Sequence, residues 1–306
     1  MFAVVLGAAA GGGFPQWNSH APACRRARDG DRSARPATQA SIAVSLDGRA
    51  WILLNASPDL RQQIEATPCL YPREGLRSSP ILGVALTGGD VDAIAGLLTL
   101  RERQPFTIFG TKRIQDVLDA NPIFEVLARD LVVRRAVPLD EPVIVAETAD
   151  GARRLTLEFF AVPGKVPLYL EQPGTAPLIV EGEETVGIAV GDGRRRLFFI
   201  PGCAAMTDAL ARRLAGADVV FFDGTLWTDD EMIRAGLGAK TGARMGHMSI
   251  DGPAGTLAAF RSLDVGRKIL IHINNSNPVL LSDSPERAIV EAAGWDVAYD
   301  GMEVTP

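Results

Sequence analysis

The most informative stretch of this sequence is Leu86-Thr87-Gly88-Gly89-Asp90-Val91-Asp92-Ala93-Ile94. It follows the apolar run 81–86, which predicts a buried strand, and it opens a segment with apolar residues at helical spacing up to Leu100. The carboxylates of Asp90 and Asp92 therefore lie at a predicted turn between a strand and a helix. Carboxylates so placed can bind a cation, or Asp92 can cap the helix, as aspartate often does. Taken alone, the stretch favours the capping role.

The composition is that of an ordinary globular protein. The 306 residues are 47% hydrophobic, enough to bury a sizeable core. A formal net charge of -6 argues against non-specific nucleic-acid binding, which needs clustered lysine and arginine. No apolar run reaches the roughly 20 residues that span a bilayer, so we expect no membrane segment. The cysteines, Cys24, Cys69 and Cys203, form no CxxC pair, and the apolar N-terminus lacks a basic region. We therefore predict a cytoplasmic protein with reduced cysteines.

The N-terminal segment begins with a predicted strand over residues 2–6. The glycines Gly11-Gly12-Gly13 that follow are typical of a dinucleotide-binding turn, which needs a helix next. Residues 15–36 contain prolines and basic residues instead, and they predict a long loop. A dinucleotide-binding role is therefore not expected.

The rest of the chain alternates strands and helices. Segments 40–45 and 50–55 predict a hairpin around Asp47-Gly48, and Ser57 is a candidate cap for the helix after it. Further strands are predicted at 106–110, 155–162, 185–190, 196–200, 218–222, 268–271 and 295–299, and further helices at 112–118, 208–214, 254–263 and 284–293. This order predicts an α/β fold in which two sheets face each other with helices outside.

Several predicted strands are followed by polar side chains that can bind metals. His272 follows the apolar strand at 268–271, Asp223 follows 218–222, and Cys203 follows 196–200 and a turn. Imidazole, carboxylate and thiolate groups are the ligands of transition-metal sites. For Asp223 or Cys203 alone, a role as a turn former is the better interpretation. The recurrence of such residues at four strand ends, Asp90 and Asp92 included, favours a site.

Eight motifs, in order along the chain, carry a resemblance to a known family. They are Gly11-Gly12-Gly13-Phe14-Pro15-Gln16-Trp17-Asn18, Leu53-Leu54-Asn55-Ala56-Ser57-Pro58-Asp59, Asp90-Val91-Asp92, Val162-Pro163-Gly164-Lys165-Val166-Pro167, Ile200-Pro201-Gly202-Cys203, Asp223-Gly224-Thr225, Gly246-His247-Met248 and His272-Ile273-Asn274-Asn275-Ser276-Asn277-Pro278. Together they resemble the pyrroloquinoline quinone (PQQ) biosynthesis protein B family of the metallo-β-lactamase superfamily. The resemblance implies one αββα sandwich domain over residues 1–306. It is similar to the ribonuclease Z branch, whose loop histidine would correspond to His247.

The superfamily's metal motif is largely missing from this chain. The motif, HxHxDH, falls on Gly88, Asp90, Asp92 and Ala93, so only the aspartate at Asp92 is retained. Members of the family typically carry a histidine where this chain has Ala93. The bridging aspartate of the superfamily falls on Cys203. Too few ligands remain for a dinuclear zinc hydrolase.

A second departure concerns the loop after Pro15-Gln16-Trp17-Asn18. The family typically carries a CxCxxC zinc-binding loop there, whereas this chain has one cysteine, Cys24, with His20 nearby. A tetrahedral zinc site needs four good ligands. We therefore expect no structural zinc, and a loop over residues 15–36 that is more mobile than in relatives with all three cysteines.

The resemblance implies a role in making or handling PQQ, a tricyclic quinone with three carboxylates. In one function, a single iron or other divalent metal is held by Asp90, Asp92 and His272, with Cys203 as a further candidate ligand. The protein would then hydroxylate the tyrosine-derived ring of a PQQ precursor, with Asp92, His247 and His272 as catalytic residues. In the alternative, the pocket binds or transports PQQ or its precursor without catalysis, and the missing imidazole at position 93 weakens the enzymatic function.

Either function needs donors for the carboxylates of the ligand. The resemblance and the position of basic and amide residues near its motifs suggest Lys165, Lys240 and Arg244 as cations, and Asn274 and Asn275 as amide donors. Exposed lysine and arginine are usually only solvated, so these assignments depend on where the side chains lie. A homodimer is an open alternative to a monomer.

Overall fold

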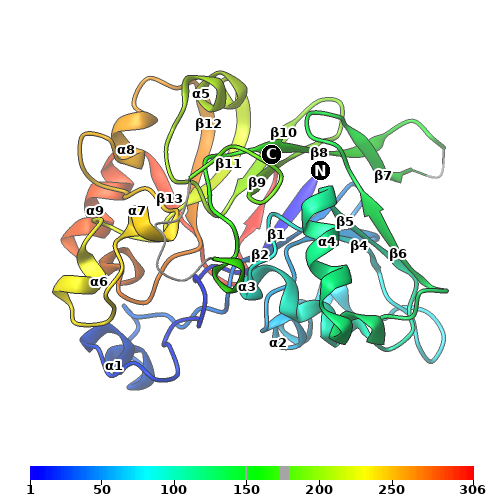
Figure 1. The fold of residues 1–306 in the computed structure, drawn as a ribbon, viewed down its shortest axis with the longest axis horizontal. Helices are drawn as coiled ribbons and strands as arrows, with labels where there is room; N and C mark the ends of the chain where they lie inside the picture. The colour runs from blue at the N-terminus through cyan, green and yellow to red at the C-terminus, as the bar shows by residue number, and fades with distance from the viewer. Residues whose placement is uncertain (149, 172–178) are drawn as a thin grey trace.

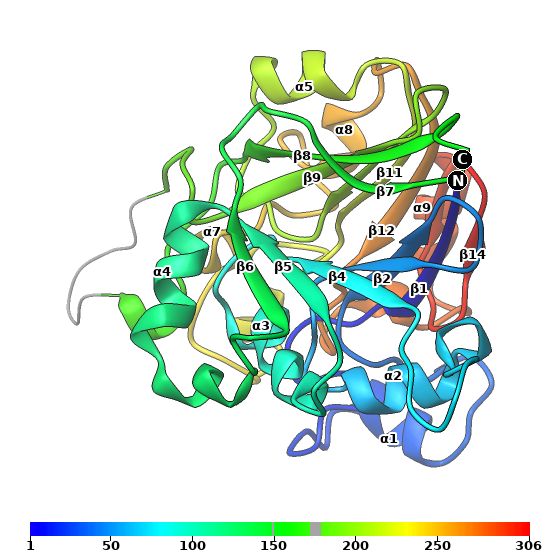
Figure 2. The same ribbon diagram turned by 90° about the vertical axis from the view of Figure 1, so that its right-hand side faces the viewer.

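The computed structural model describes residues 1–148, 150–171 and 179–306. Two seven-stranded sheets lie at its centre, in the orders β14-β1-β2-β3-β4-β5-β6 and β13-β12-β11-β10-β9-β8-β7. The sheets face each other and helices cover their outer faces, with α5 and α8 over the second sheet and α2 under the first (Figure 1, Figure 2). This arrangement confirms the predicted αββα sandwich. No helix in the described ranges combines the length and the apolar character needed to cross a membrane.

The first sheet places the residues after β4 at one edge of the sandwich. Its strands are β1 (Phe2–Gly7), β2 (Ser41–Ser45), β3 (Trp51–Leu54), β4 (Ile81–Ala85), β5 (Phe106–Gly110), β6 (Val132–Ala136) and β14 (Glu303–Val304). Strands β2 and β3 form the predicted antiparallel hairpin, and Gly48 in its turn has φ 75°, a conformation that glycine adopts at little cost. Strands β3, β4, β5 and β6 run parallel. Their carboxyl ends, including the segment that carries Asp90 and Asp92, therefore point to the same edge.

The second sheet places three further polar segments at the end of its parallel strands. Its strands are β7 (Val143–Glu147), β8 (Arg154–Ala161), β9 (Val186–Gly191), β10 (Arg196–Ile200), β11 (Ala217–Asp223), β12 (Val265–Ile271) and β13 (Trp295–Val297). Strands β10, β11, β12 and β13 are parallel neighbours. The segments that begin at Pro201, Asp223 and His272 therefore leave the sheet side by side.

The helices are short. They are α1 (Pro22–Arg28), α2 (Leu60–Ala66), α3 (Val91–Ile94), α4 (Lys112–Ala120), α5 (Asp208–Leu214), α6 (Glu231–Arg234), α7 (Gly242–Met245), α8 (Thr256–Ala259) and α9 (Pro285–Ala292). Single 3-10 turns add η1 (Pro68–Leu70), η2 (Ala95–Leu100), η3 (Pro122–Val126), η4 (Leu168–Leu170) and η5 (Pro278–Leu280). The predicted helix at 254–263 is only the four-residue α8. Helix α2 begins after Asp59, and no side chain caps it, so the cap predicted at Ser57 is wrong.

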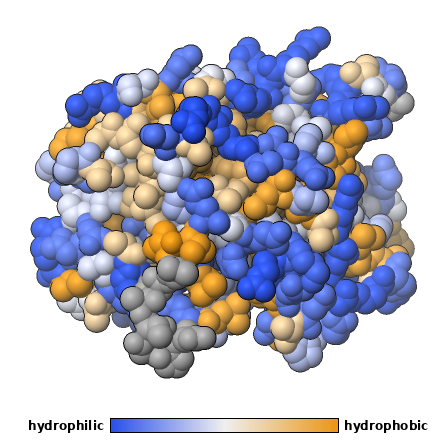
Figure 3. All heavy atoms as spheres, turned by 45° about the horizontal axis from the view of Figure 1, so that its top comes forward, coloured by the Kyte–Doolittle hydropathy of each residue, from blue (hydrophilic) through white to orange (hydrophobic). Residues whose placement is uncertain are grey.

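The second sheet is buried on both faces because its side chains alternate between two cores. Phe159 and Phe199 belong to the core between the sheets, whereas their neighbours Phe160 and Phe198 belong to the core under the outer helices, which also contains Phe260. Strands buried on both faces are expected to have continuous apolar sequences. Polar side chains dominate the face of the molecule shown in Figure 3, with apolar residues in small groups. The cores hold the strand ends, and so the site, in fixed positions.

The segment 15–36 differs from its prediction as a loop, because it contains helix α1. Pro22 occupies the first turn of this helix, a position where proline is well tolerated. Cys24 and Ala27 lie on its inner face and pack in a small apolar cluster with Phe14 and Ala34. This packing orders a segment whose composition is typical of a loop.

Candidate metal centre

Residues from the two sheets meet at one end of the sandwich. Asp92, in the first turn of α3, and His272, directly after β12, are 180 positions apart in the chain. The Oδ2 atom of Asp92 nevertheless lies 2.8 Å from the Nε2 atom of His272. The sequence places each of these residues at a strand end, and the structure brings them together.

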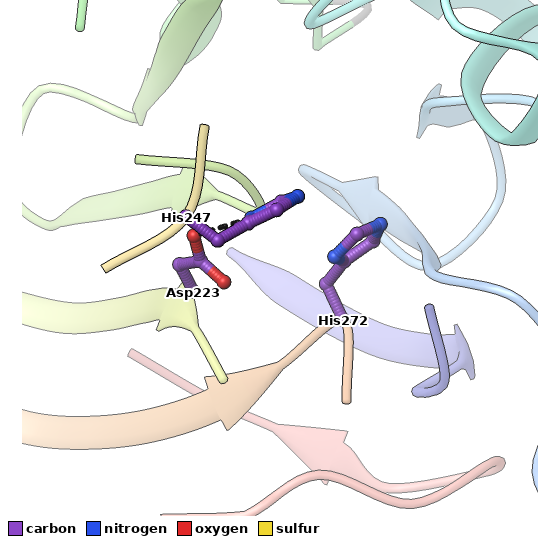
Figure 4. Close-up of side chains that lie close together, drawn as sticks. All are labelled: Asp223, His247 and His272. Carbon is purple, nitrogen blue, oxygen red and sulfur yellow. Dashed lines mark hydrogen bonds and ion pairs between the residues drawn. The ribbon is translucent and has the colours of Figure 1, made fainter. Parts of the chain in front are cut away.

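Asp223 at the end of β11, His272 directly after β12 and His247 shortly after α7 form a compact group (Figure 4). Each residue offers one ligand atom, and these atoms lie within 4.8 Å of one another. The two imidazole rings stack with centroids 5.3 Å apart and an interplanar angle of 23°. His272 has φ 60°, a left-handed backbone conformation that is uncommon for residues other than glycine and that often marks functional sites.

The carboxylate of Asp223 accepts hydrogen bonds on both oxygens. Its Oδ1 atom accepts from the backbone N–H of Thr225 at 3.0 Å and from the Thr225 hydroxyl at 2.6 Å. Its Oδ2 atom accepts from the backbone N–H of Cys203 at 2.8 Å and contacts His247 Nδ1 at 2.7 Å. A carboxylate has about four lone-pair positions, so a metal bound by Asp223 would displace one of these partners. Asp223 therefore fits the role of a group that orients its neighbours.

Burial and neighbouring charges have opposite effects on the pKa of Asp223. Complete burial by itself would raise the pKa of this carboxyl group. The charge and the hydrogen bond of His247 outweigh burial and hold the pKa of Asp223 below its usual range. The carboxylate form is therefore the stable one.

Asp90 and Asp92 differ in their surroundings, although they are two positions apart. Burial, followed by the charge of Asp92, raises the pKa of Asp90. Burial also acts to raise the pKa of Asp92, but the hydrogen bond from His272 and its charge lower it below the usual range. The same contact raises the pKa of His272 against the effect of its burial. Asp92 and His272 thus stabilise each other's charged form.

The helix-capping role predicted for Asp92 is wrong. Asp90 is the residue at the cap position of α3, and neither it nor any other side chain makes a cap hydrogen bond. Asp92 lies inside the first turn, and its carboxylate is directed to His272 instead. The next residue, Ala93, lines the cavity beside it and has no donor atom on its side chain.

Cys203 contributes its backbone to the group and directs its sulfur elsewhere. The Sγ atom donates to Ala205 O at 3.2 Å. Burial, followed by the charge of Asp223, raises the pKa of the thiol to about 12, whereas metal binding requires a thiolate. The sequence alignment with the superfamily motif put its aspartate on Cys203, but in space the carboxylate beside the two histidines is Asp223. The geometry does not support Cys203 as a ligand.

The site opens into a cavity of about 440 Å³. Its walls include both sheets and the segments that follow their strands. Seven of the residues predicted for the site line the cavity: Asp90, Asp92, Lys165, Lys240, His247, His272 and Asn274. Within the described ranges, Arg244 and Asn275 do not line it. Gln16, Asn55 and Thr87 are lining residues that sequence reasoning missed, although Gln16 and Asn55 lie in motifs that carry the family resemblance.

Two of the three predicted cations are engaged by a carboxylate of the protein itself. Lys165 Nζ lies 2.8 Å from Glu171 Oε1, and Arg244 donates to Glu171 Oε2 at 3.0 Å. These two cations lower the pKa of Glu171 to about 2. Lys240 is half-buried in the cavity wall and, across the described part of the chain, has no carboxylate within ion-pair distance. Lys240 is therefore the cation that remains available to a ligand.

Asn275 supports the cavity wall from behind. Its side-chain N–H donates to Gln16 Oε1, and its Oδ1 atom accepts from Cys24 Sγ at 3.7 Å. The neighbouring Asn274 donates to Ser276 Oγ. With its oxygen engaged by Asn275, Gln16 leaves its own N–H groups for the cavity.

Comparison with known proteins gives this geometry a context. A family model, the Beta-lactamase superfamily domain, matches residues 50–273. A coenzyme PQQ synthesis protein B from Gluconacetobacter diazotrophicus is 63% identical over 99% of this chain and 98% of its own length. One from Xanthomonas campestris pv. campestris is 56% identical over 99% of both chains.

A solved structure of a relative agrees over the whole length. The crystal structure of Zn²⁺-bound PqqB from Methylobacterium extorquens is 52% identical, covers 100% of both chains and superposes with a TM-score of 0.96. A diphosphatase of the PhnP family, 18% identical over 99% of this chain and 96% of its own with a TM-score of 0.67, shares the fold alone. With this identity and coverage, the chain belongs to the coenzyme PQQ synthesis protein B family of the β-lactamase superfamily, and its role lies in PQQ biosynthesis.

Proposed function

We propose that this protein hydroxylates the tyrosine-derived ring of a PQQ precursor at one divalent metal ion held by Asp92 and His272. The observation that carries the proposal is the distance of 2.8 Å between Asp92 Oδ2 and His272 Nε2. Two donor atoms this close can both reach one ion at metal–ligand distances of about 2.0–2.2 Å. Asp90 and His247 line the same cavity and are further candidates.

The donor set suits a divalent transition metal. Imidazole and carboxylate ligands with open positions are typical of non-haem ferrous sites, and they also bind zinc. The relative from Methylobacterium extorquens was solved with zinc bound. Hydroxylation by dioxygen needs a metal that changes its oxidation state, which ferrous iron does and zinc does not. Metal identity therefore separates a catalytic form of the protein from an inactive one.

The cavity supports a small, acidic substrate. Its volume of about 440 Å³ lies within the range of about 300–1,000 Å³ that is usual for small-molecule sites. Lys240 would pair with a carboxylate of the precursor, and Gln16 and Asn274 would orient it by hydrogen bonds. Lys165 and Arg244 would hold Glu171 and the cavity wall rather than the substrate.

His247 is the residue proposed to move a proton. Its Nδ1 atom is engaged by Asp223 at 2.7 Å, which leaves Nε2 to accept the proton of a phenolic ring. In the overall reaction one oxygen atom of dioxygen enters a C–H bond of the ring. The other leaves as water, with two electrons and two protons from an external reductant.

The test is a reconstitution of metal-free protein with one equivalent of ferrous iron or of zinc. The probe is a synthetic tyrosine that carries a second carboxylate chain on its ring, given with ascorbate and isotopically labelled oxygen gas. We expect one labelled oxygen atom in the product with iron, none with zinc, and none with iron in His272→Ala. The variant His20→Ala, at an exposed histidine outside the cavity, should behave as wild type. Iron-loaded wild type without product would overturn the proposal.

A second function, binding or transport of PQQ without catalysis, is favoured by Ala93, which lines the cavity without a donor atom. This function needs no metal. It predicts that metal-free protein binds one PQQ in an equilibrium titration, that Lys240→Ala weakens the binding, and that the labelled-oxygen experiment gives no product with any metal.

A further inference from the structure

The hydroxyl group of Thr225 touches every member of the Asp223 group. Its Oγ1 atom lies 2.6 Å from Asp223 Oδ1, 2.8 Å from His272 Nδ1 and 3.1 Å from His247 Nδ1. It also lies 3.0 Å from the backbone oxygen of His272. The Thr225 residue is 4% exposed.

Counting protons decides the direction of these hydrogen bonds. A threonine hydroxyl has one proton to donate and two lone pairs that accept. The ionised Asp223 carboxylate can only accept, so the hydroxyl proton belongs on the short contact to Asp223 Oδ1. The contact of 2.8 Å from Oγ1 to His272 Nδ1 is then a hydrogen bond only if Nδ1 carries a proton and donates.

The opposite arrangement fails at Asp223. If Thr225 donated to His272 Nδ1, two oxygen atoms 2.6 Å apart would face each other without a proton between them. Protonating Asp223 would relieve this contact, but both of its oxygens already accept from backbone N–H groups, Oδ1 from Thr225 and Oδ2 from Cys203.

The same count applies to His247. Its Nδ1 atom lies 2.7 Å from Asp223 Oδ2, and an acceptor there requires a proton on Nδ1. We propose that Thr225 is a positioning residue which, together with Asp223, keeps a proton on Nδ1 of both histidines, so that Nε2 is the ring nitrogen left for a ligand. Figure 4 shows that the second nitrogen of each ring points away from Asp223. The Nε2 atom of His272 donates its proton to Asp92 Oδ2 at 2.8 Å, and the proposed metal would displace that proton, so the hydroxyl sets the ligand atom.

The backbone around Thr225 keeps the hydroxyl in place. Its N–H donates to Asp223 Oδ1, and its carbonyl accepts from Asn274 N at 3.0 Å and from Asn277 Nδ2 at 3.4 Å. Threonine is also branched at Cβ, which restricts rotation about χ1. The single hydroxyl is thus fixed relative to both rings before any ligand arrives.

The experiment compares Thr225→Val, which keeps the shape and removes the hydroxyl, with Thr225→Ser, which keeps the hydroxyl. The first readout is the ring ¹⁵N NMR spectrum of metal-free protein. We expect a proton on Nδ1 of both histidines in wild type and Thr225→Ser, and loss of that proton from His272 in Thr225→Val. The second readout is zinc affinity, which should fall about 10–100-fold in Thr225→Val, as when a partner of a metal ligand is removed, and recover in Thr225→Ser.

The control is Thr256→Val, because Thr256 is another buried threonine, and its hydroxyl bonds to the backbone oxygen of Ser249 and not to a histidine. It should change neither readout. Unchanged spectra and zinc affinity in Thr225→Val would overturn the proposal. So would a histidine in wild type whose Nδ1 carries no proton, which decides the question even if Thr225→Val fails to fold.

This inference rests on the proposed metal site, but the two fail separately. Wild type that binds no zinc and no iron would overturn the proposed function. The spectra of the metal-free protein would still show whether Thr225 sets the protonation of the rings.

Discussion

The two walls of the cavity differ in how completely their polar atoms are engaged. On the second wall, formed by Thr225, His247 and His272 with the buried Asp223 behind them, each oxygen of the Asp223 carboxylate and both Nδ1 atoms have partners within 3.1 Å. On the first wall, formed by Asp90, Asp92 and Ala93, burial raises the pKa of Asp90, and Ala93 has no polar side-chain atom. The hydrogen bonds that orient the metal ligands are therefore all formed on the second wall, whereas the first wall offers few ligand atoms. Changes to the second wall should therefore mainly lose function, whereas the first wall has room to gain it.

The largest effect should follow from His272→Ala. His272 is the residue through which the second wall touches the first, at 2.8 Å from Asp92. Losing even an outer partner of a metal ligand costs about 10–100-fold in affinity, so losing this imidazole should cost at least about 100-fold in a calorimetric zinc titration. His20→Ala is the control. Unchanged zinc binding in His272→Ala would show that the metal binds elsewhere and that the two walls do not share it.

Asp223→Asn should lower the free energy of unfolding by about 2 kcal/mol. The amide N–H group of asparagine would face hydrogen-bond donors, which the oxygens of the Asp223 carboxylate now accept from. Unfolding in urea measures the change. Asp218→Asn, at the other end of β11, removes an exposed contact to Arg195 and should cost less than about 1 kcal/mol. Equal costs for the two variants would show that the second wall is not specially dependent on its carboxylate.

Ala93→His should strengthen metal binding about 10-fold, because it adds an imidazole to the sparse wall next to Asp92. Ala95→His, two residues later and not among the cavity-lining residues in the described ranges, is the matched control. Zinc titrations of both variants check the prediction. A gain in Ala95→His as large as that in Ala93→His would show non-specific binding by the added imidazole.

The smallest effect concerns Glu171, outside both walls. Lys165 and Arg244 lower its pKa from 4.5 to about 2, so its contribution to stability is present above pH 4.5 and is lost as the pH falls toward 2. The contribution should be about 1 kcal/mol or less, as for most ion pairs near the surface. The difference in unfolding free energy between wild type and Glu171→Gln should shrink over this pH range. A difference that stays constant would show that the carboxylate is not stabilised by these cations.

The central strands could be predicted because burial leaves a clear pattern in the sequence. Strands β5 and β10 have the predicted bounds, and the αββα layers follow from them. Strands β6, β7 and β14 are not evident from the sequence. They lie at the ends of the two sheets, and most side chains of β6 and β7 are at least partly exposed. Edge strands therefore lack the apolar runs that identify central ones.

Part of the site was predictable because the place of a residue can follow from its own strand. His272 and Asp92 each follow an apolar strand, and parallel strands end at a common edge. Cys203 and Asp223 lie on adjacent segments. Which of their two side chains points to the histidines cannot be predicted from a local sequence pattern. The pairing of Lys165 and Arg244 with Glu171 is likewise a contact across 6 and 73 positions, visible only in the folded chain.

The contact between Asp92 and His272 also links the two layers of the sandwich across 180 positions of the chain. An ion bound by both residues would add a further link between the two layers. Such a link opposes separation of the sheets, and the ion binds the native chain more tightly than the unfolded one. Cleavage by proteases, which depends on transient opening, would then be slower for filled copies than for empty ones. The abundance of the protein in a cell would follow the supply of its metal.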